Sequence, residues 1–541
     1  MQSIFFTPIV LIAGVTAASF YSLYAFAQEE IKISSYVFVS AVSITAVGGL
    51  FRLITSGGHT SAGRKPTPAA LVCMMCCTAG IAIGSYAELM LRKERQPPHT
   101  LAALSSVRTI IVELTGEPLP AGTDYYHIPV QAIACSAADT AEFSLSGRLH
   151  VLVPAALIRG TYAGGVTRIG ERSGMKASSV LLNTAEPFSR FLHDAQPCRF
   201  YARGMRILVT GSFSKTGEVF YAKPVQPVFL GWSSSFSRMR ALLRFAFMRM
   251  LYGWGNAGGL LLALLAADKA FLPQNCTEAF RNAGLAHILA LSGMHLSLIG
   301  TAALQGGRLF GHKKRALYFS LAAVCAFVWF AGSAPSLNRA LGMVFIAAIG
   351  EALGFKPPVF SVLCTMLTLH IAFGSADAVT LGFMLSYGAC AGILIFGEAC
   401  ARLAAGAIIP AIAQSLSASI GAQLFTAPIV IGAIGTAAAG GIIASCIVSP
   451  LVSFFLIGGL IAIPLTLLFP PIGAILGYVL NGCYCVIFSA ADFFAHLPFI
   501  VPETPLQRVL VSGTAFALGL LLTGVASFRT RKELQHLPRL T

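Results

Sequence analysis

Charged residues are scarce in this chain. Only 11% of its 541 residues are Asp, Glu, Lys or Arg, whereas a soluble domain contains about 25%. Hydrophobic residues make up 56% of the chain, more than a single soluble core accommodates. The composition excludes an ordinary soluble protein and predicts a polytopic α-helical membrane protein, because a bilayer can surround long apolar segments.

Motifs typical of several enzyme classes are missing as well. The chain has no G-x-x-x-x-G-K-[ST] phosphate loop and no H-E-x-x-H metalloprotease motif. Its thirteen cysteines do not form the paired C-x-x-C motifs of a structural zinc site. We therefore predict a protein that is not an enzyme and that needs no metal ion and no cofactor.

Two cysteines stand apart from the others, which lie mostly in apolar runs as small buried hydrophobes. Cys135 and Cys198 lie in the one long polar stretch of the chain. They are candidates for a disulfide if that stretch is extracytoplasmic. If it is not, both remain thiols.

Acidic residues are fewer than basic ones: 21 Asp and Glu against 37 Lys and Arg, a formal charge of +16. In a membrane protein, Lys and Arg collect in the cytoplasmic loops. A basic balance also suits a polyanionic substrate. Both explanations remain open at this level.

Apolar runs divide the chain into four parts. Residues 1–92 hold three runs long enough to be transmembrane helices, and residues 93–235 hold none. Residues 236–527 are again apolar, and residues 528–541 form a basic tail that we expect in the cytoplasm. The sum is about twelve spans with one inserted polar domain.

The inserted domain, residues 93–235, is rich in short stretches of β-forming residues. Four of them, at 126–134, 142–153, 206–213 and 218–230, are separated by Gly and Pro. Such spacing predicts a small all-β domain. A five-stranded OB-like barrel fits this length, although other small β folds do too.

Charges next to the first runs indicate the topology. Glu29 and Glu30 follow the first run, and Arg64 and Lys65 follow the second. The positive-inside rule then puts the N-terminus in the cytoplasm and the β domain outside. Later basic loops agree only if residues 258–267 do not span, so we expect a re-entrant or surface segment there.

Polar residues inside predicted spans indicate functional sites because they are costly in lipid. His287 and His295 lie eight residues apart in a span predicted at 284–306, so a helix would turn both to one side. Ser292 and Gly293 lie between them. The alternative is that both histidines only hydrogen-bond to neighbouring helices.

A second polar group contains Asn338 and Arg339, just after Gly332 and Pro335 interrupt the apolar pattern. An arginine at this depth requires a carboxylate, a cluster of carbonyl groups or an anionic ligand such as phosphate. The conceivable carboxylate partners are Asp268, Glu351 and Asp377. Weaker polar positions within the predicted spans are Ser386 and Gln423.

Several of these segments resemble motifs of the ComEC family, the competence-type DNA internalisation channels. Residues 284–295 resemble its "Gly-Leu-x-His-hydrophobic-Leu-Ala-hydrophobic-Ser-Gly-x-His" segment. Residues 333–340, 381–392 and 422–428 resemble "Ser-x-Ser-x-x-Arg-Ala", "Gly-Phe-x-Leu-Ser-Phe-x-Ala" and "Ala-Gln-x-x-Thr-x-Pro". Residues 263–269 resemble a lead-in motif but depart from it at two positions.

The resemblance implies an inner-membrane channel for uptake of single-stranded DNA during natural transformation, in the bacterial cytoplasmic membrane. It implies an extracytoplasmic DNA receptor or nuclease and a cytoplasmic helicase-like ATPase as partners, besides membrane lipid. Many members end in a metallo-β-lactamase-like domain; here we expect another protein to remove the second strand. The residues expected along the DNA path are His287, Ser292, Gly293, His295, Asn338, Arg339, Ser386 and Gln423.

Basic and aromatic residues near the polar domain are expected to guide the DNA backbone and to stack on its bases. The basic candidates are Arg199, Arg203, Arg206, Arg240 and Arg244, and the aromatic ones are Phe200, Tyr201, Phe213 and Tyr221. Two other functions stay open. One is transport of another anionic solute or lipid, and the other is an intramembrane enzyme using His287, His295 and Asp268.

Overall fold

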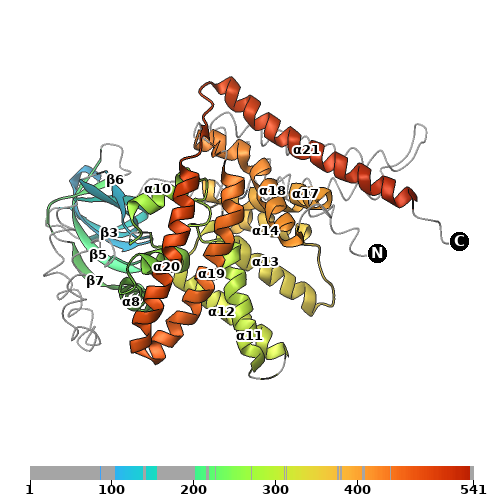
Figure 1. Ribbon diagram of the computed structural model, residues 1–541. Helices are drawn as coiled ribbons and strands as arrows, with labels where there is room; N and C mark the ends of the chain where they lie inside the picture. Colours follow the sequence, from blue (N-terminus) through green and yellow to red (C-terminus); the bar gives the residue numbers. More distant parts are fainter. Residues whose placement is uncertain are drawn as a thin grey trace. The chain divides into compact units, whose positions relative to one another are not determined.

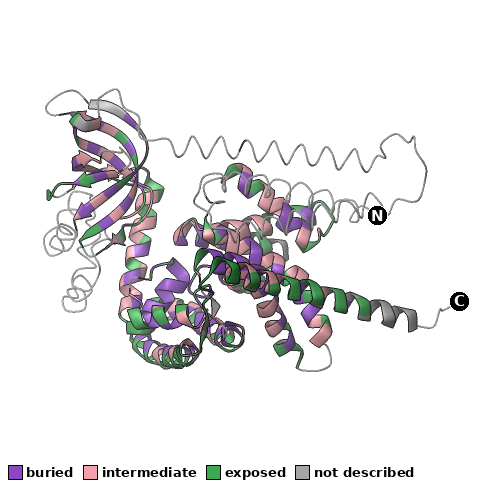
Figure 2. Ribbon diagram, turned by 90° about the horizontal axis from the view of Figure 1, so that it is seen from above, coloured by how far each residue is buried: buried purple, intermediate pink, exposed green. Residues whose placement is uncertain are grey.

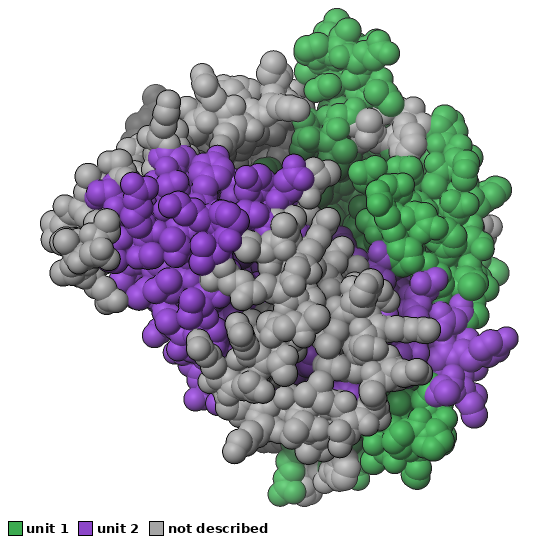
Figure 3. Space-filling view, turned by 90° about the vertical axis from the view of Figure 1, so that its left-hand side faces the viewer, with its two compact units in different colours: residues 1–91, 273–473, 482–541 green, residues 92–272, 474–481 purple. Residues whose placement is uncertain are grey.

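The computed structural model describes residues 104–154 and 201–536, with short gaps, together with Tyr86. The three spans predicted within residues 1–92 therefore lie, apart from Tyr86, outside the described residues, as do Cys198, Arg199 and Phe200. The chain forms two compact units, coloured in Figure 3. The barrel unit comprises Arg92–Leu272 and Ala474–Asn481, and the helical unit comprises the remainder.

The barrel unit contains a closed ring of five strands (Figure 1). Hydrogen bonding runs from β1 to β3, β4, β6 and β5 and returns to β1, with β4 and β6 parallel and the other pairs antiparallel. This is the closure of a five-stranded OB-type barrel, which confirms the predicted all-β domain. The five strands are β1 (Val107–Leu114), β3 (Tyr125–Ala137), β4 (Glu142–Pro154), β5 (Met205–Phe213) and β6 (Val219–Ala222). A short strand, β2 (Leu119–Ala121), pairs with β3, and β7 (Val228–Trp232) pairs with β5.

Two details of the barrel differ from the prediction. Strand β1 was not predicted, because an irregularity at Arg108 changes its phase and the apolar Ile111 lies between the buried Ile110 and Val112, so the sequence does not alternate clearly. The stretch predicted at 218–230 is two strands, β6 and β7, with Pro224 and Pro227 between them. Proline lacks the N–H that a central strand donates to its neighbour, so the ladder ends there.

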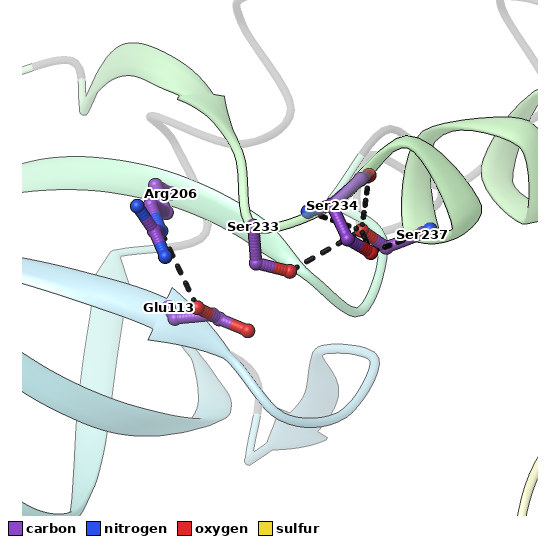
Figure 4. A network of polar contacts seen from close by, with 5 residues as sticks. All are labelled: Glu113, Arg206, Ser233, Ser234 and Ser237. Carbon is purple, nitrogen blue, oxygen red and sulfur yellow. Dashed lines mark hydrogen bonds and ion pairs between the residues drawn. The ribbon is translucent and has the colours of Figure 1, made fainter.

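Helix α8 (Ser235–Tyr252) follows the barrel and begins at a capping box (Figure 4). The Ser234 hydroxyl accepts from the Ser237 N–H, and the Ser234 N–H donates to the Ser237 hydroxyl, each at 3.1 Å. Gly204 lies against this cap with φ +85°, and a Cβ there would lie 2.4 Å from Ser237 Cβ. A residue other than glycine at this position would push the helix away from the barrel.

Helix α9 (Gly255–Ala266) contains the segment whose path was left open by the sequence. Its 12 residues extend about 18 Å, which is too short for a bilayer core of about 30 Å. Every residue from Ala257 to Ala266 is buried, so this is not a helix lying on a surface. Asn481 holds its first turn, accepting from the Ala257 N–H at 3.1 Å and donating to the Trp254 carbonyl at 2.7 Å.

Among the residues that the structure describes, five helices are long and apolar enough to cross a membrane: Leu381–Ala404, Ile412–Ala433, Gly441–Leu468, Pro470–Ala495 and Pro505–Ala526. Large apolar side chains stand exposed on them, such as Phe454 at 75% and Phe493 at 68%, as expected for surfaces that face lipid. Figure 2 shows the exposure along the last helix. The protein is therefore a membrane protein with an all-β domain, and the total of about twelve spans remains a prediction.

The bounds of the helices in the helical unit are α10 (Gln274–Asn282), α11 (Gly293–Leu309), α12 (Lys313–Ala331), α13 (Pro335–Ala352), α14 (Val359–Phe373), α16 (Leu381–Gly392), the π-helix η3 (Ile393–Gly397), α17 (Glu398–Ala404), α18 (Pro410–Ala433), α19 (Gly441–Leu468), α20 (Pro470–Ala495) and α21 (Pro505–His536). Residues 474–481 of α20 belong to the barrel unit. A small ladder joins β8 (Ala437–Ala438) to β9 (Phe499–Ile500).

Glycines let α18 approach α16 and the π-helix η3 at backbone distance. A Cβ at Gly421 would lie 2.4 Å from the Gly397 nitrogen, and one at Gly392 would lie 2.3 Å from the Gly421 oxygen. Small residues permit close crossing of membrane helices, which are held together by packing rather than by the hydrophobic effect. This crossing positions α16, which carries part of the candidate site.

Candidate functional site

Two interruptions of the helical unit meet at the candidate site. One is the segment of turns and bends at 284–292 between α10 and α11, and the other is residues 332–334 between α12 and α13. The Ser336 hydroxyl in the first turn of α13 donates to the Leu291 carbonyl at 2.5 Å, which joins them. Non-helical backbone at membrane depth is tolerated where protein or a water-filled cavity surrounds it.

His295 lies in the first turn of α11 and is fully buried. Its Nδ1 accepts from the Ser292 N–H at 3.1 Å, and the Ser292 hydroxyl lies at the same distance. A neutral imidazole whose Nδ1 is an acceptor carries its proton on Nε2. That Nε2 is buried and has no hydrogen-bond partner in the described part of the chain. The ring therefore presents a buried N–H donor.

His287 does not share a helix face with His295, and this part of the prediction is wrong. Helix α11 begins only at Gly293, so the eight residues between the two histidines are not one helical segment. His287 is exposed, and its Nδ1 lies 3.2 Å from the Gly284 carbonyl oxygen. Gly284 adopts a positive φ, and turns and bends continue up to Gly293, so the helix that the apolar pattern predicted from residue 284 does not form.

Arg339 projects from the first turns of α13 toward α16. One terminal N–H donates to the Ser386 carbonyl at 2.8 Å, and the guanidinium carbon lies 5.9 Å from the centre of the Tyr387 ring. A Cβ on Gly293 would contact the guanidinium at 3.6 Å. Gly293, Arg339 and Ser386 thus lie close together, and that they line a common path stays a prediction.

The charge of Arg339 is not balanced by an ion pair with any described carboxylate of this unit. Glu351 is exposed, and Asp377 contacts other groups. The side chain of Arg339 is half-buried, and its Nε is buried without a hydrogen-bond partner among the described residues. A carbonyl group and an aromatic face hold the cation, which leaves it able to bind an anion.

A chain of hydrogen bonds, here called the polar chain, supports the aromatic face. Asn338 donates to Asp377 at 3.3 Å, and His370 Nε2 lies 3.4 Å from the same carboxylate oxygen. His370 Nδ1 lies 3.2 Å from the Tyr387 hydroxyl. The polar chain therefore runs from α13 through α14 to α16 and ends on the ring that faces Arg339.

Sequence reasoning missed His370 and the role of Tyr387. His370 lies near the end of an apolar helix, and an intramembrane histidine is itself a signal of function. Tyr387 follows Ser386 directly, but nothing in the sequence links it to a histidine 17 residues earlier. Gln423, in contrast, lies against α19, where a Cβ on Gly441 would meet its side-chain nitrogen at 3.3 Å.

The predicted basic surface of the barrel unit needs one correction. Arg244 is only 6% exposed, and its guanidinium binds Glu117 at 2.8 Å and the Ala266 carbonyl at 3.0 Å. It ties α8 to the last turn of α9 and is not available at the surface. Burial and the nearby Arg244 lower the pKa of Arg240 to about 10, so Arg240 stays charged at neutral pH.

The other described arginines of the predicted surface reach solvent. Arg203 is exposed, and Arg206 forms a cross-strand ion pair with Glu113 at 3.3 Å (Figure 4). An exposed pair of this kind contributes about 0–1 kcal/mol, so Arg206 can exchange Glu113 for another anion. Arg199 lies outside the described residues.

Of the aromatic residues proposed for base stacking, Tyr221 is exposed at 44%. Tyr201 and Phe213 are partly buried against the barrel core, and burial raises the pKa of Tyr201 to about 12; base stacking by these two stays a prediction. Phe200 is not among the described residues.

The structure bears only in part on the predictions about the disulfide and about metal ions. Cys135 is buried in the barrel core, but its predicted disulfide partner Cys198 is not described, so the disulfide stays a prediction. Within the described ranges, no group of three or more His, Cys, Asp or Glu side chains is arranged to hold a metal ion.

Comparison with known proteins finds a family match that lies mostly in the helical unit. The family model described as "Competence protein" matches residues 264–525. ComE operon protein 3 of Bacillus subtilis (strain 168) is 25% identical over 134 residues, which are 24% of this chain and 17% of that protein. The match thus spans about a sixth of that relative's length. No solved structure matches the chain.

Proposed function

Because residues 264–525 are a domain of the competence-protein family, as their resemblance to ComEC channels indicated, we propose that this protein is a channel for uptake of single-stranded DNA. It acts in the bacterial inner membrane during natural transformation. An extracytoplasmic receptor or nuclease delivers the strand, and a cytoplasmic helicase-like ATPase supplies the energy.

The observation that carries the proposal is the state of Arg339. Its cation is held by a carbonyl group and a ring, with no described carboxylate in contact and with Nε unused. An arginine already paired with a carboxylate would gain little from a passing phosphate. A guanidinium held by neutral groups keeps both its charge and free donors, and its planar fork matches a phosphate group.

The surroundings of Arg339 suit transient binding. The helix interruptions at 284–292 and 332–334 leave non-helical backbone beside it, and the buried His295 N–H adds a neutral donor in the same unit. Conduction requires binding that is favourable enough for entry and weak enough for release. In this proposal the strand passes Ser292, Gly293, His295, Asn338, Arg339 and Ser386, with His287 and Gln423 at other points of the path.

The barrel unit, in this proposal, lies outside the membrane and meets the DNA first. Arg203 and Arg206 offer exposed cations, and Tyr221 offers an exposed ring for stacking. The OB-type barrel is a fold that binds oligonucleotides in many proteins, which supports the proposal by analogy of fold only.

The test compares Arg339→Ala and Arg339→Lys with Arg402→Ala. Arg402 is an exposed helix arginine paired with Glu398, so its removal controls for the loss of one positive charge. A transformation assay would measure DNA bound at the cell surface and DNA that reaches the cytoplasm separately. We expect Arg339→Ala to abolish arrival while surface binding persists, Arg339→Lys to be less impaired, and Arg402→Ala to behave as wild type.

Two results would contradict the proposal. If Arg339→Ala removes folded protein from the membrane, and a change at Glu351 or Asp377 restores it, the arginine is half of a structural pair. If deletion of the gene leaves arrival of DNA in the cytoplasm unchanged, the protein transports another anionic solute or lipid.

A further inference from the structure

Two histidines lie side by side on the outer face of the barrel. His127 is on β3 and His150 on β4, and the ladder pairs His127 with Leu152 and Pro129 with His150. The histidines are thus diagonal neighbours on one face, while Ile128 and Val151 next to them point into the core. His150 is exposed and His127 is half-buried.

Their rings present nitrogen atoms to each other. His127 Nε2 lies 2.5 Å from His150 Nδ1, and the ring centres are 4.5 Å apart with an angle of 37° between the planes. Each of these nitrogens offers a lone pair in one of its tautomers. A proton between the rings is bonded to one nitrogen and accepted by the lone pair of the other, so only one lone pair is used. A metal ion is bound by both lone pairs at once.

We infer that His127 and His150 form a binding site for a late first-row divalent cation: Cu²⁺, Ni²⁺ or Zn²⁺. Neutral imidazole is the protein ligand that suits these ions. Bonds of about 2.0–2.1 Å at tetrahedral or square-planar angles require the two nitrogens to lie about 2.9–3.4 Å apart. The rings therefore need to separate by less than about 1 Å to admit the ion.

The backbone makes this movement small and local. Strands β3 and β4 are 13 residues each and are paired almost throughout their length, so the two Cα positions are held by the ladder. Because His150 is exposed, rotation of its side chain opens the pair without disturbing the core. The backbone therefore already holds the two histidines next to each other, and their imidazole rings can move to admit the ion.

The coordination is incomplete with protein groups alone. No third His, Cys, Asp or Glu joins the pair within the described residues. Water or an external ligand completes the coordination sphere, so the ion binds reversibly and is not a structural requirement of the barrel. This inference does not depend on the proposed channel function, because it rests only on the barrel unit.

The test uses the full-length protein in detergent, purified with a tag that contains no histidine. Titration with Cu²⁺, followed by electron paramagnetic resonance, should show one tightly bound ion with nitrogen coupling from two imidazoles. His127→Ala and His150→Ala should each weaken that binding at least about 100-fold, since loss of even an outer-shell partner costs up to this much. His496→Ala, which removes another exposed histidine, should leave it unchanged.

Wild-type protein gives a second measurement that does not depend on variants folding. Zn²⁺ should protect His127 and His150, but not His496, from acylation by diethyl pyrocarbonate, as read by peptide mass spectrometry. Equal modification of the two histidines with and without Zn²⁺ would overturn the inference. So would Cu²⁺ binding in a folded His127→Ala variant as tight as in wild type; the pair would then be a hydrogen-bonded pair only.

Discussion

The polar chain allows a prediction about how the Arg339 site is held. His370→Ala removes the ring that contacts both Asp377 and the Tyr387 hydroxyl. Tyr387→Phe removes only the hydroxyl and keeps the ring beneath Arg339. The two changes therefore separate the hydrogen bond from the aromatic face, and we expect His370 to act as a positioning residue for that face.

The structure sets the size of each effect. His370→Ala leaves the Tyr387 hydroxyl without its partner, at a cost of about 1–3 kcal/mol. It also removes an edge contact between His370 and Phe383, whose ring centres are 5.1 Å apart, worth about 0.5–1.5 kcal/mol. Asp377 is 36% exposed, so water replaces much of its lost contact. We expect a total destabilisation of about 2–4 kcal/mol, and about 1 kcal/mol for Tyr387→Phe.

The double variant distinguishes a direct hydrogen bond from coincidence. In a Tyr387→Phe background the hydroxyl is already absent, so His370→Ala should reduce stability less than it does in the wild type. The two effects should fall short of additivity by about 0.6 kcal/mol, the average coupling between hydrogen-bonded side chains in membranes, and by no more than about 1.7 kcal/mol, the largest. Additivity to within about 0.3–0.5 kcal/mol would mean that the two residues are independent.

Unfolding in detergent would measure these energies, and arrival of DNA in the cytoplasm per folded molecule would measure the site. We expect Tyr387→Phe to keep transport, His370→Ala to lose it, and His370→Gln to restore part of it, because an amide can both donate to Asp377 and accept from Tyr387. If His370→Ala changes stability but leaves transport per folded molecule at the wild-type value, the positioning role is refuted.

Two further predictions concern packing and topology. Gly421→Ala should reduce the amount of folded protein, because its Cβ would lie 2.4 Å from the Gly397 nitrogen and overpacking costs about 1–3 kcal/mol or more; Gly513→Ala, in a helix position with nothing within 4 Å, should be neutral or stabilising. Wild-type recovery of Gly421→Ala in detergent would contradict the close crossing. Reporter fusions between residues 100 and 230 should be active only outside the cytoplasmic membrane, and cytoplasmic activity would overturn the topology drawn from the charge pattern.

Local patterns were enough for the broad features of this protein. The scarcity of charge and the long apolar runs indicate a membrane protein, since each span must provide about 20 apolar residues in a row. Alternating β-formers identified most strands of the OB-type barrel. The Gly284-to-His295 segment carried the family resemblance, because its residues are adjacent in the chain and can be recognised without a fold.

The strands and helices that escaped prediction are those whose local pattern is interrupted. Strand β1 changes phase at Arg108, and its apolar Ile111 lies between two buried residues, so its sequence does not alternate clearly. The helix expected from residue 284 begins at Gly293, because Gly284 adopts φ +74° and packs against Ala438 and Gly441 from another part of the chain. A positive φ at one glycine ends a helix that hydrophobicity alone would extend.

The pairings of polar side chains depend on contacts between distant segments, and only the tertiary structure decided them. The sequence indicated that Arg339 needs a partner, but the fold selected the Ser386 carbonyl and the Tyr387 ring over a carboxylate. It likewise buried Arg244 between Glu117 and Ala266 and brought His127 next to His150. Each of these side chains could satisfy its hydrogen bonds in several ways, and the packing of the helices and strands leaves one of them.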